Sequence, residues 1–188
     1  GMFVGLLLIL GGASLFLSQY MRDLLDTRAR EELRSKVGLV RMMIETNLQG
    51  VAREVGYLNR ALAGQFPGGI VRRDNGDEAQ LVHGSEVLNG NYAVLDRFSR
   101  EMDAVATLFV RQGEDFVRVS TSLKKEDGSR AVGTMLDRAH PAYARLLSGK
   151  AYVGPAILFG KDFYTSYVPL LDSSGTVVGA SFVGADIS

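Results

Sequence analysis

One arginine stands inside a run of residues that otherwise predicts a β-strand. The segment 116–122 reads FVRVSTS, with Arg118 between two valines. A buried guanidinium without a partner is very costly, so Arg118 either faces water on a half-buried strand or binds an anion. The planar donors of a guanidinium match the geometry of a carboxylate. The hydroxyl residues that would flank such a carboxylate site are Ser120, Thr121 and Ser122. Strict alternation would place Phe116, Arg118, Ser120 and Ser122 on one side of the strand and Thr121 on the other.

A second group of polar residues surrounds the start of a later strand. Residues 159–167 read FGKDFYTSY. Alternation puts Tyr164 and Ser166 on one face and Thr165 and Tyr167 on the other. Tyrosine is common on ordinary sheet surfaces, so a structural role is the alternative. The candidate ligand residues outside segment 116–122 are Lys161, Tyr164, Ser166, Tyr152 and His140. His140 could instead cap the short helix that follows it and pack against Tyr143.

The sequence carries no pattern for catalysis or for a cofactor. It has no nucleophile elbow, P-loop, zinc-protease helix motif or dinucleotide fingerprint. It has no cysteine and only two histidines, which are far apart, so we expect no metal site. The 21 basic and 21 acidic residues balance, which argues against a nucleic-acid partner. We therefore expect a binding domain, with no enzymatic activity and no cofactor.

The amino-terminal end has the composition of a membrane anchor. Residues 1–21 contain no charged side chain. The apolar run just reaches the roughly 20 residues that a membrane span requires. We expect residues 1–21 to be the remnant of a membrane anchor, without its cytoplasmic flank. A signal-peptide core and a buried helix are the alternatives.

Residues 22–63 predict one long amphipathic helix. Apolar side chains recur every three or four residues, and no proline occurs before Pro67. At 1.5 Å per residue the helix would reach about 60 Å, which is longer than the remaining domain is wide. We therefore expect part of the apolar stripe to pack on a twin helix in a homodimer. The stripe consists of Leu33, Val37, Val40, Ile44, Leu48, Val51, Val55, Leu58 and Leu62.

Residues 64–188 predict one domain whose strands are joined by turns. Asn75-Gly76 suits a hairpin turn, and Pro141 begins a short helix over 141–147. Strands are expected near 92–98, 104–111, 116–122, 151–159, 163–171 and 176–186. Because short turns join neighbours, the strands should pair antiparallel. The fold class is α+β: a long helix, then a central antiparallel sheet of about five strands with a short helix.

Several segments together resemble one known family. They are ATLFVRQGEDFVRVSTSLKKEDGSRAVGT (106–134), HPAY (140–143), GKAYVG (149–154), LFGKDFYTSYVPL (158–170) and DSSGTVVGASFVGADIS (172–188). In this order they resemble the extracytoplasmic Cache sensor domains of bacterial methyl-accepting chemotaxis proteins. The type is the single, PAS-like Cache domain of the Cache_3/Cache_2 fusion class.

The resemblance implies a sensor in the periplasm, at the end of a helix that leaves the inner membrane. It implies a ligand pocket on one face of a PAS-like sheet. It also implies a second membrane helix after Ser188 that leads to a cytoplasmic signalling module. Two alternatives stay open. One is a sensor in front of a histidine kinase or a cyclic-nucleotide enzyme, and the other is an anchored dimerisation or scaffold domain without a ligand.

The resemblance also implies a ligand class. Related citrate and C4-dicarboxylate sensors bind carboxylates through basic and hydroxyl residues on the corresponding strands. By position, Arg118 with Thr121 or Ser122 would meet the carboxylate. The opposite wall would consist of Tyr152, Tyr164 and Ser166. The histidine expected beside the arginine is absent, and Ser120 to Ser122 take its place, which favours a short organic acid such as acetate over a tricarboxylate.

Overall fold

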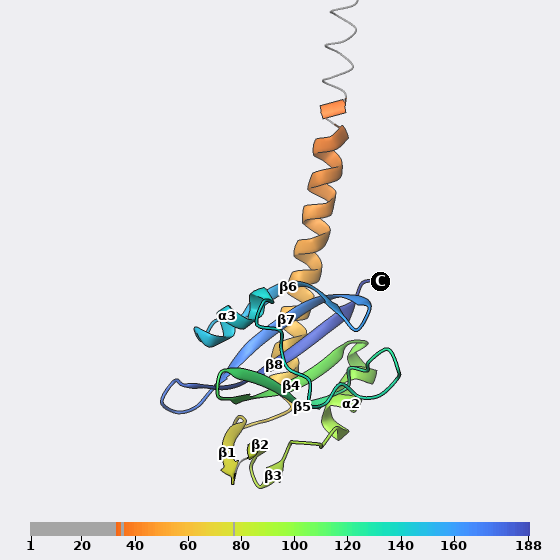
Figure 1. Ribbon diagram of the computed structural model, residues 1–188. Coiled ribbons are helices and arrows are strands. Elements are labelled where there is room, and N and C mark those ends of the chain that lie inside the picture. Colours follow the sequence, from red (N-terminus) through yellow and green to blue (C-terminus); the bar gives the residue numbers. More distant parts are fainter. Residues whose placement is uncertain (1–32, 35, 77) are drawn as a thin grey trace, which may run out of the picture. The chain divides into compact units, whose positions relative to one another are not determined.

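The computed structural model describes residues 33–34, 36–76 and 78–188 (Figure 1). The chain divides into two compact units, Gly1–Leu48 and Gln49–Ser188. In the first unit the described residues are helical and their side chains are exposed.

Two sequence predictions fall partly outside this range. The predicted anchor, residues 1–21, lies outside the described residues, as does the 22–32 part of the predicted long helix. Where the structure describes the chain, no helix is both long and apolar enough to cross a membrane. Helix α1 (36–63) begins in the first unit and ends in the second, so the predicted helix is confirmed over that range.

The second unit is built around a five-stranded antiparallel sheet. Its spatial order is β5-β4-β8-β7-β6. The strands are β4 (Val105–Gln112), β5 (Asp115–Thr121), β6 (Tyr152–Leu158), β7 (Lys161–Leu171) and β8 (Val177–Asp186). Long runs of buried residues in β4 and β8 place these strands at the centre of the sheet. The predicted α+β class is thereby confirmed.

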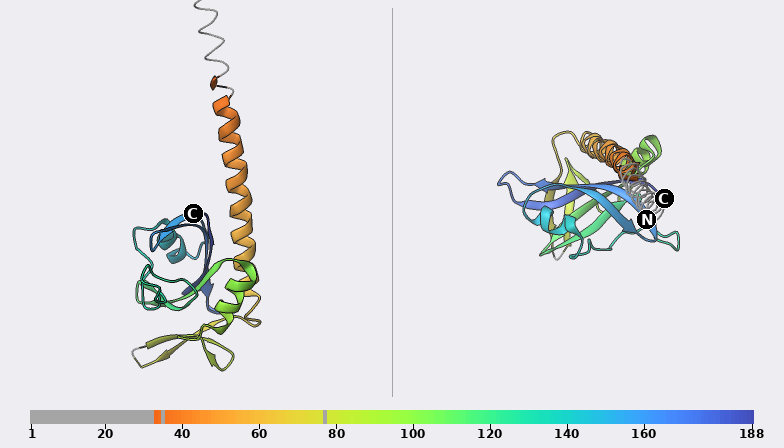
Figure 2. Two further views of the ribbon diagram at one scale, coloured as in Figure 1. Left: turned by 90° about the vertical axis from the view of Figure 1, so that its right-hand side faces the viewer. Right: turned by 90° about the horizontal axis from the view of Figure 1, so that it is seen from above.

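Helices cover the sheet from two sides. Residues 49–63 of α1 and helix α2 (Ala93–Met102) lie on one face, while α3 (Pro141–Leu147) lies on the other (Figure 2). The part of the predicted apolar stripe that falls within residues 49–63 packs here, because Val55, Leu58 and Leu62 are buried. We call these two sides of the sheet the α1 face and the α3 face.

A smaller three-stranded sheet precedes α2. It consists of β1 (Val71–Asn75), β2 (Glu78–His83) and β3 (Glu86–Val87), in that order. Asn75 is the last residue of β1 and pairs with Glu78, and Gly76 in the turn has φ 62°. The predicted hairpin is therefore confirmed, with Asn75 in the strand rather than in the turn.

The strand predicted near residues 92–98 is wrong, because this segment belongs to helix α2. Leu95 and Phe98 are its buried residues, three positions apart. That spacing matches the helical period rather than the alternation of a strand. The Asn91 side chain accepts a hydrogen bond from the Ala93 N–H at the start of the helix. Asparagine side chains commonly form such bonds two residues ahead in turns, but the apolar composition of the segment favoured a strand.

A β-bulge changes which side of the sheet the end of β5 faces. Phe109 pairs with Arg118 and Leu108 pairs with Ser120, so Val119 is an extra residue on β5. Beyond Val119 the side chains have therefore shifted by one position relative to strict alternation.

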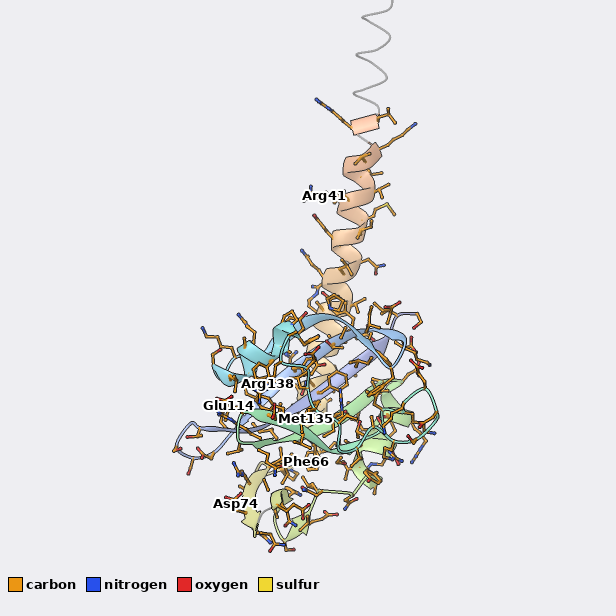
Figure 3. The ribbon with its side chains drawn as sticks, in the orientation of Figure 1. Arg41, Phe66, Asp74, Glu114, Met135 and Arg138 are labelled. Carbon is orange, nitrogen blue, oxygen red and sulfur yellow. The ribbon has the colours of Figure 1, made fainter. Side chains whose placement is uncertain are left out.

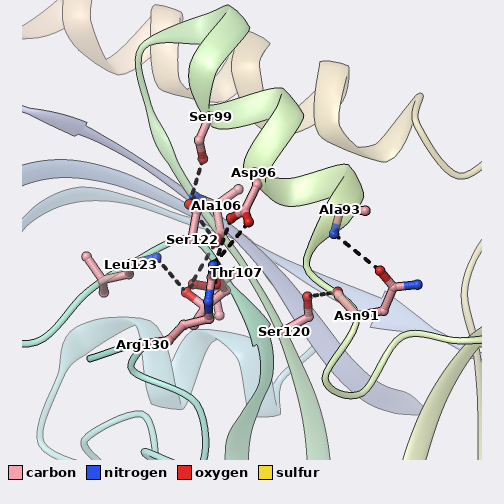
Figure 4. Close-up of polar contacts among 11 residues, drawn as sticks. Asn91, Ala93, Asp96, Ser99, Ala106, Thr107, Ser120, Ser122, Leu123 and Arg130 are labelled. Carbon is pink, nitrogen blue, oxygen red and sulfur yellow. Dashed lines mark hydrogen bonds and ion pairs between the residues drawn. The ribbon is translucent and has the colours of Figure 1, made fainter. Parts of the chain in front are cut away.

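The predicted alternation beyond Arg118 is therefore wrong. Ser120 and Ser122 lie on the α1 face, where Ser120 donates to the Asn91 carbonyl and Ser122 accepts from the Ser99 hydroxyl at 2.6 Å (Figure 4). Thr121 shares the α3 face with Arg118, and its hydroxyl lies 2.6 Å from that of Thr107.

Candidate functional site

Arg118 is buried on the α3 face with only 3% of its surface exposed. Its Nη1 donates to the Thr134 hydroxyl at 2.7 Å, and its Cζ lies 4.8 Å from the Phe109 ring centroid and 5.8 Å from that of Phe159. Among the described residues, no carboxylate forms an ion pair with this guanidinium. Burial lowers the pKa of Arg118, and the nearby Tyr167 opposes that effect. The strand therefore holds a buried cation that has no counter-ion among the described residues.

The connection between β5 and α3 supplies the residues that cover Arg118. Arg118 N–H donates to the Thr134 carbonyl at 2.9 Å, and Gly133 N–H donates back to the Arg118 carbonyl at 2.9 Å. Near its carboxyl end the connection is held by Arg138, which donates to both carboxylate oxygens of Asp115 at 2.8 and 3.0 Å. Figure 3 labels Arg138 and Glu114, the residue before Asp115. These bonds hold a long loop in place across the α3 face.

Tyr167 is the largest fully buried side chain of the site. Its ring centroid lies 4.8 Å from that of Phe182 and 5.4 Å from that of His140. Burial raises the pKa of Tyr167, and the positive charge of Arg118 opposes that effect. The phenol therefore stays protonated and can donate a hydrogen bond.

Tyr152 packs beside Tyr167 and, with His140 and Phe182, forms the aromatic wall of the site. Tyr152 and Tyr167 are paired across β6 and β7, and their ring centroids lie 6.1 Å apart. Gly154 lets the Tyr152 ring lie along β6, because a Cβ at residue 154 would overlap the Tyr152 hydroxyl.

His140 caps helix α3 and directs its other ring nitrogen into the site. Its Nδ1 accepts a hydrogen bond from the Ala142 N–H at 3.1 Å, so the proton of the neutral ring is on Nε2. Burial lowers the pKa of His140, and Asp137 partly opposes that effect. The predicted cap is confirmed, and the ring packs against Tyr152 and Tyr167.

Three buried donors at this place have no hydrogen-bond partner in the described part of the chain. They are Arg118 Nε, Tyr167 Oη and His140 Nε2. A buried polar group without a partner costs about 1–3 kcal/mol, and folded proteins leave few of them. A ligand with acceptor oxygens is the kind of partner that each of these donors lacks.

The neutral state of His140 predicts a pH dependence of stability. Its folded pKa lies below the ordinary value of 6.5, so the unfolded chain binds this proton first as the pH falls. The free energy of unfolding should therefore fall as the pH drops from 6.5 to the folded pKa, and level off below it. Asparagine is a good helix cap that does not titrate. Denaturant unfolding should show a smaller loss between pH 7.5 and pH 5.5 in His140→Asn than in the parent, and equal losses would contradict the assignment.

The structure brings together only some of the residues predicted from the sequence. Arg118, Tyr152 and His140 lie at the site, and Thr121 lies on the same face of the sheet with its hydroxyl already bound to the Ala106 carbonyl. Lys161 pairs with Asp186 at 3.5 Å and lines a separate surface groove. The residues on the opposite, α1 face are Ser120, Ser122, Tyr164 and Ser166.

Sequence reasoning did not select Tyr167, Thr134 or Phe159 as ligand residues. Tyr167 was recognised within the polar segment 159–167, on the face opposite Ser166, but its position across from Tyr152 is known only from the pairing of β6 with β7. Thr134 lies in a loop with no periodic pattern, so nothing in the sequence pairs it with Arg118.

Residues 18–188 match the Cache 3/Cache 2 fusion domain. The crystal structure of the E. coli DcuS sensor domain is similar at 16% identity and a TM-score of 0.47, over 76% of this chain and 92% of that chain. Methyl-accepting chemotaxis protein X is similar at 14% identity and a TM-score of 0.43, over 76% of this chain and 59% of that chain. No curated protein sequence matches.

The family match covers most of the chain, including both strands that carry Arg118 and Tyr167. It confirms the resemblance found in the sequence. The protein therefore belongs to the Cache 3/Cache 2 fusion domain family of sensor domains.

Proposed function

We propose that this domain senses a short monocarboxylate, such as acetate, outside the cytoplasm and signals to the membrane as part of a chemoreceptor. The observation that carries the proposal is the group of three unpartnered donors, one of them on a buried cation without a counter-ion. A carboxylate supplies both the acceptors and the negative charge that this group lacks.

One edge of the guanidinium has an unused donor that a carboxylate could accept from. Nη1 donates to Thr134, whereas the buried Nε has no partner among the described residues. The Nε–H and the adjacent Nη2–H point in the same direction, so a carboxylate can bind both at once. Tyr167 and His140 would then donate to the same anion from the neighbouring wall.

The charges at the site favour one carboxylate over two. Arg118 is a single cation, and burial keeps His140 neutral. Arg130 lies on the same connection, and it is bound to Asp96 at 2.7 Å. A second carboxylate would enter this aromatic setting without a cation to meet it. Aromatic rings of Phe109, Phe159 and Tyr152 instead suit a short apolar tail.

A ligand screen tests the function. The full chain would be titrated calorimetrically with acetate, propionate, pyruvate, succinate and citrate, and with neutral acetamide as the matched control. We expect the monocarboxylates to bind and acetamide to fail. In thermal melts, a ligand at a hundred times its dissociation constant should add about 2.7 kcal/mol of stability. If no anion binds, the scaffold alternative is correct.

The chemoreceptor output is testable separately. Joined to the signalling module of a chemoreceptor, residues 1–188 should make kinase control respond to the acid that binds best. A chimera that binds the acid without any response would favour a different output module, such as a histidine kinase.

The exposed helix of the first unit supports the proposed homodimer. Val37, Val40, Ile44 and Leu48 are exposed at the three- and four-residue spacing of a helix-packing stripe, and Leu39, Met42 and Met43 are exposed beside it. The chain has no cysteine, so single replacements report cleanly. Under oxidation we expect Val40→Cys to cross-link two copies and Glu45→Cys, which lies off the stripe, to remain uncoupled. Equal cross-linking of both would contradict pairing through this stripe.

A further inference from the structure

The turn between β6 and β7 has an unfavourable residue at its first position. Leu158 pairs with Lys161, so the turn consists of Phe159 and Gly160 alone. Their φ angles are 50° and 79°. Two positive φ angles define the hairpin turn that favours Asn-Gly. A bulky residue at positive φ is strained, and such strain tends to persist at functional sites.

The strained backbone places the Phe159 ring over Arg118. The ring centroid lies 5.8 Å from the guanidinium carbon, and the side chain packs against the buried cluster of Leu123, Ala131 and Phe163. The turn itself does not require a phenylalanine, because asparagine would fit its first position better. The need for Phe159 must therefore come from the contacts of its ring.

Phe159 also lines a surface groove. The groove has a volume of about 510 Å³ and is bordered by the turn, by the loop after β5 and by the start of β4. The charges around it balance, with Lys124, Lys125 and Lys161 against Asp103, Glu126 and Asp186. Phe159 is thus common to the open groove and to the surroundings of Arg118.

The loop after β5 also contacts the turn at Gly160. A Cβ added to Gly160 would lie 3.0 Å from the Glu126 carboxylate oxygen, so the Glu126 side chain lies close against the turn. The β6–β7 turn and the loop after β5, which both border the groove, therefore meet next to Phe159.

We propose that Phe159 is the gate of the carboxylate site: its ring separates the groove from Arg118, must swing aside for ligand exchange, and limits the length of the acid admitted. This inference rests on the proposed function, since it assigns the entrance to the same site. It makes Phe159 a determinant of exchange rate and ligand size rather than a source of affinity.

Phe159→Asn tests the gate because asparagine suits the turn. Binding of fluoroacetate to the full chain would be followed by ¹⁹F NMR exchange. We expect association and dissociation rates to rise together by about tenfold or more, while the dissociation constant changes less than either rate. The melting temperature should stay level or rise, and butyrate should gain affinity relative to acetate.

Phe163→Leu is the matched control. Phe163 belongs to the same apolar cluster but is not stacked on Arg118, so this variant should melt earlier with unchanged exchange rates. If Phe159→Asn also melts earlier and exchanges fluoroacetate at the parent's rates, Phe159 is a packing residue and the gate is wrong. If the parent binds no acid at all, the proposed function has failed instead.

Discussion

Arg118→Met is expected to weaken carboxylate binding and, at the same time, to stabilise the ligand-free protein. The loss of a charge-assisted hydrogen bond should cost about 1.5–3 kcal/mol of binding energy, or roughly a ten- to hundredfold weaker affinity. Methionine keeps the apolar stem against Phe109 while removing the charge. Calorimetric titration and denaturant unfolding of the same variant measure the two effects.

The gain in stability follows from the missing counter-ion. Burial lowers the pKa of Arg118, which means that the fold disfavours the charged form that arginine nevertheless keeps at any ordinary pH. Replacing buried charges by apolar residues of similar size often stabilises a protein by about 1–4 kcal/mol. We expect the low end of that range, since the hydrogen bond to Thr134 and the cation–π contact with Phe109 are lost with the charge.

Arg130→Met is the matched control, because this arginine does have partners. It binds both oxygens of Asp96 and the Thr121 carbonyl at 2.7–3.1 Å. Its removal leaves these acceptors unpaired, so the control should lose about 1–3 kcal/mol of stability and keep its affinity for the acid. If Arg118→Met instead loses stability and binds acetate normally, Arg118 is a structural residue and the site lies elsewhere.

The sequence could predict the elements of the sheet because their signals are local. The hairpin between β4 and β5 is marked by Gly113, which has φ 62°, and the turn before β8 by Asp172 and Gly175. The start of helix α3 is indicated by the cap residue His140 and by Pro141 at its first position. Turn residues and the alternation of apolar and polar side chains can be recognised from a few neighbouring residues, so these elements could be predicted without the rest of the fold.

The site could be predicted only in part because its geometry depends on non-local events. The extra residue Val119 moves Ser120 and Ser122 to the α1 face, and no turn residue marks such a bulge within FVRVSTS. Thr134 meets Arg118 only because a loop of the chain folds back over β5. Arg118 itself was found, since an arginine between valines is anomalous by composition alone.

Asn59 joins the α1 helix to the strands that carry the site. It is 1% exposed, donates to the Ser166 carbonyl at 2.8 Å and accepts from the Ser181 hydroxyl at 2.7 Å. Ser166 and Ser181 directly precede Tyr167 and Phe182, whose side chains lie in contact on the α3 face. A ligand that displaces those rings would therefore move the two residues that hold Asn59.

Asn59→Ala should lower the free energy of unfolding by about 2–3 kcal/mol, because it leaves buried hydroxyl and carbonyl groups of two strands without a partner. Loss of stability alone does not show that Asn59 transmits a signal. A triple variant, Asn59→Leu with Ser166→Ala and Ser181→Ala, removes the side-chain groups on both sides of the contact. Since replacing both partners by apolar groups can be nearly neutral, this variant should regain most of the stability and bind the acid as the parent does.

The triple variant separates packing from coupling. Spin labels at Tyr57→Cys, a position 63% exposed on α1, and at Glu114→Cys, in the β4–β5 turn, would measure how far α1 shifts against the sheet on adding acetate. We expect a shift of about 1–2 Å in the labelled parent, the size of known switching movements between packed elements. In the triple variant the shift should vanish although the acid still binds, because a ligand moves an equilibrium only through contacts that differ between its two states. A full shift at normal affinity would mean that the apolar packing of Leu58 and Leu62 carries the signal, and Asn59 only holds the helix in place.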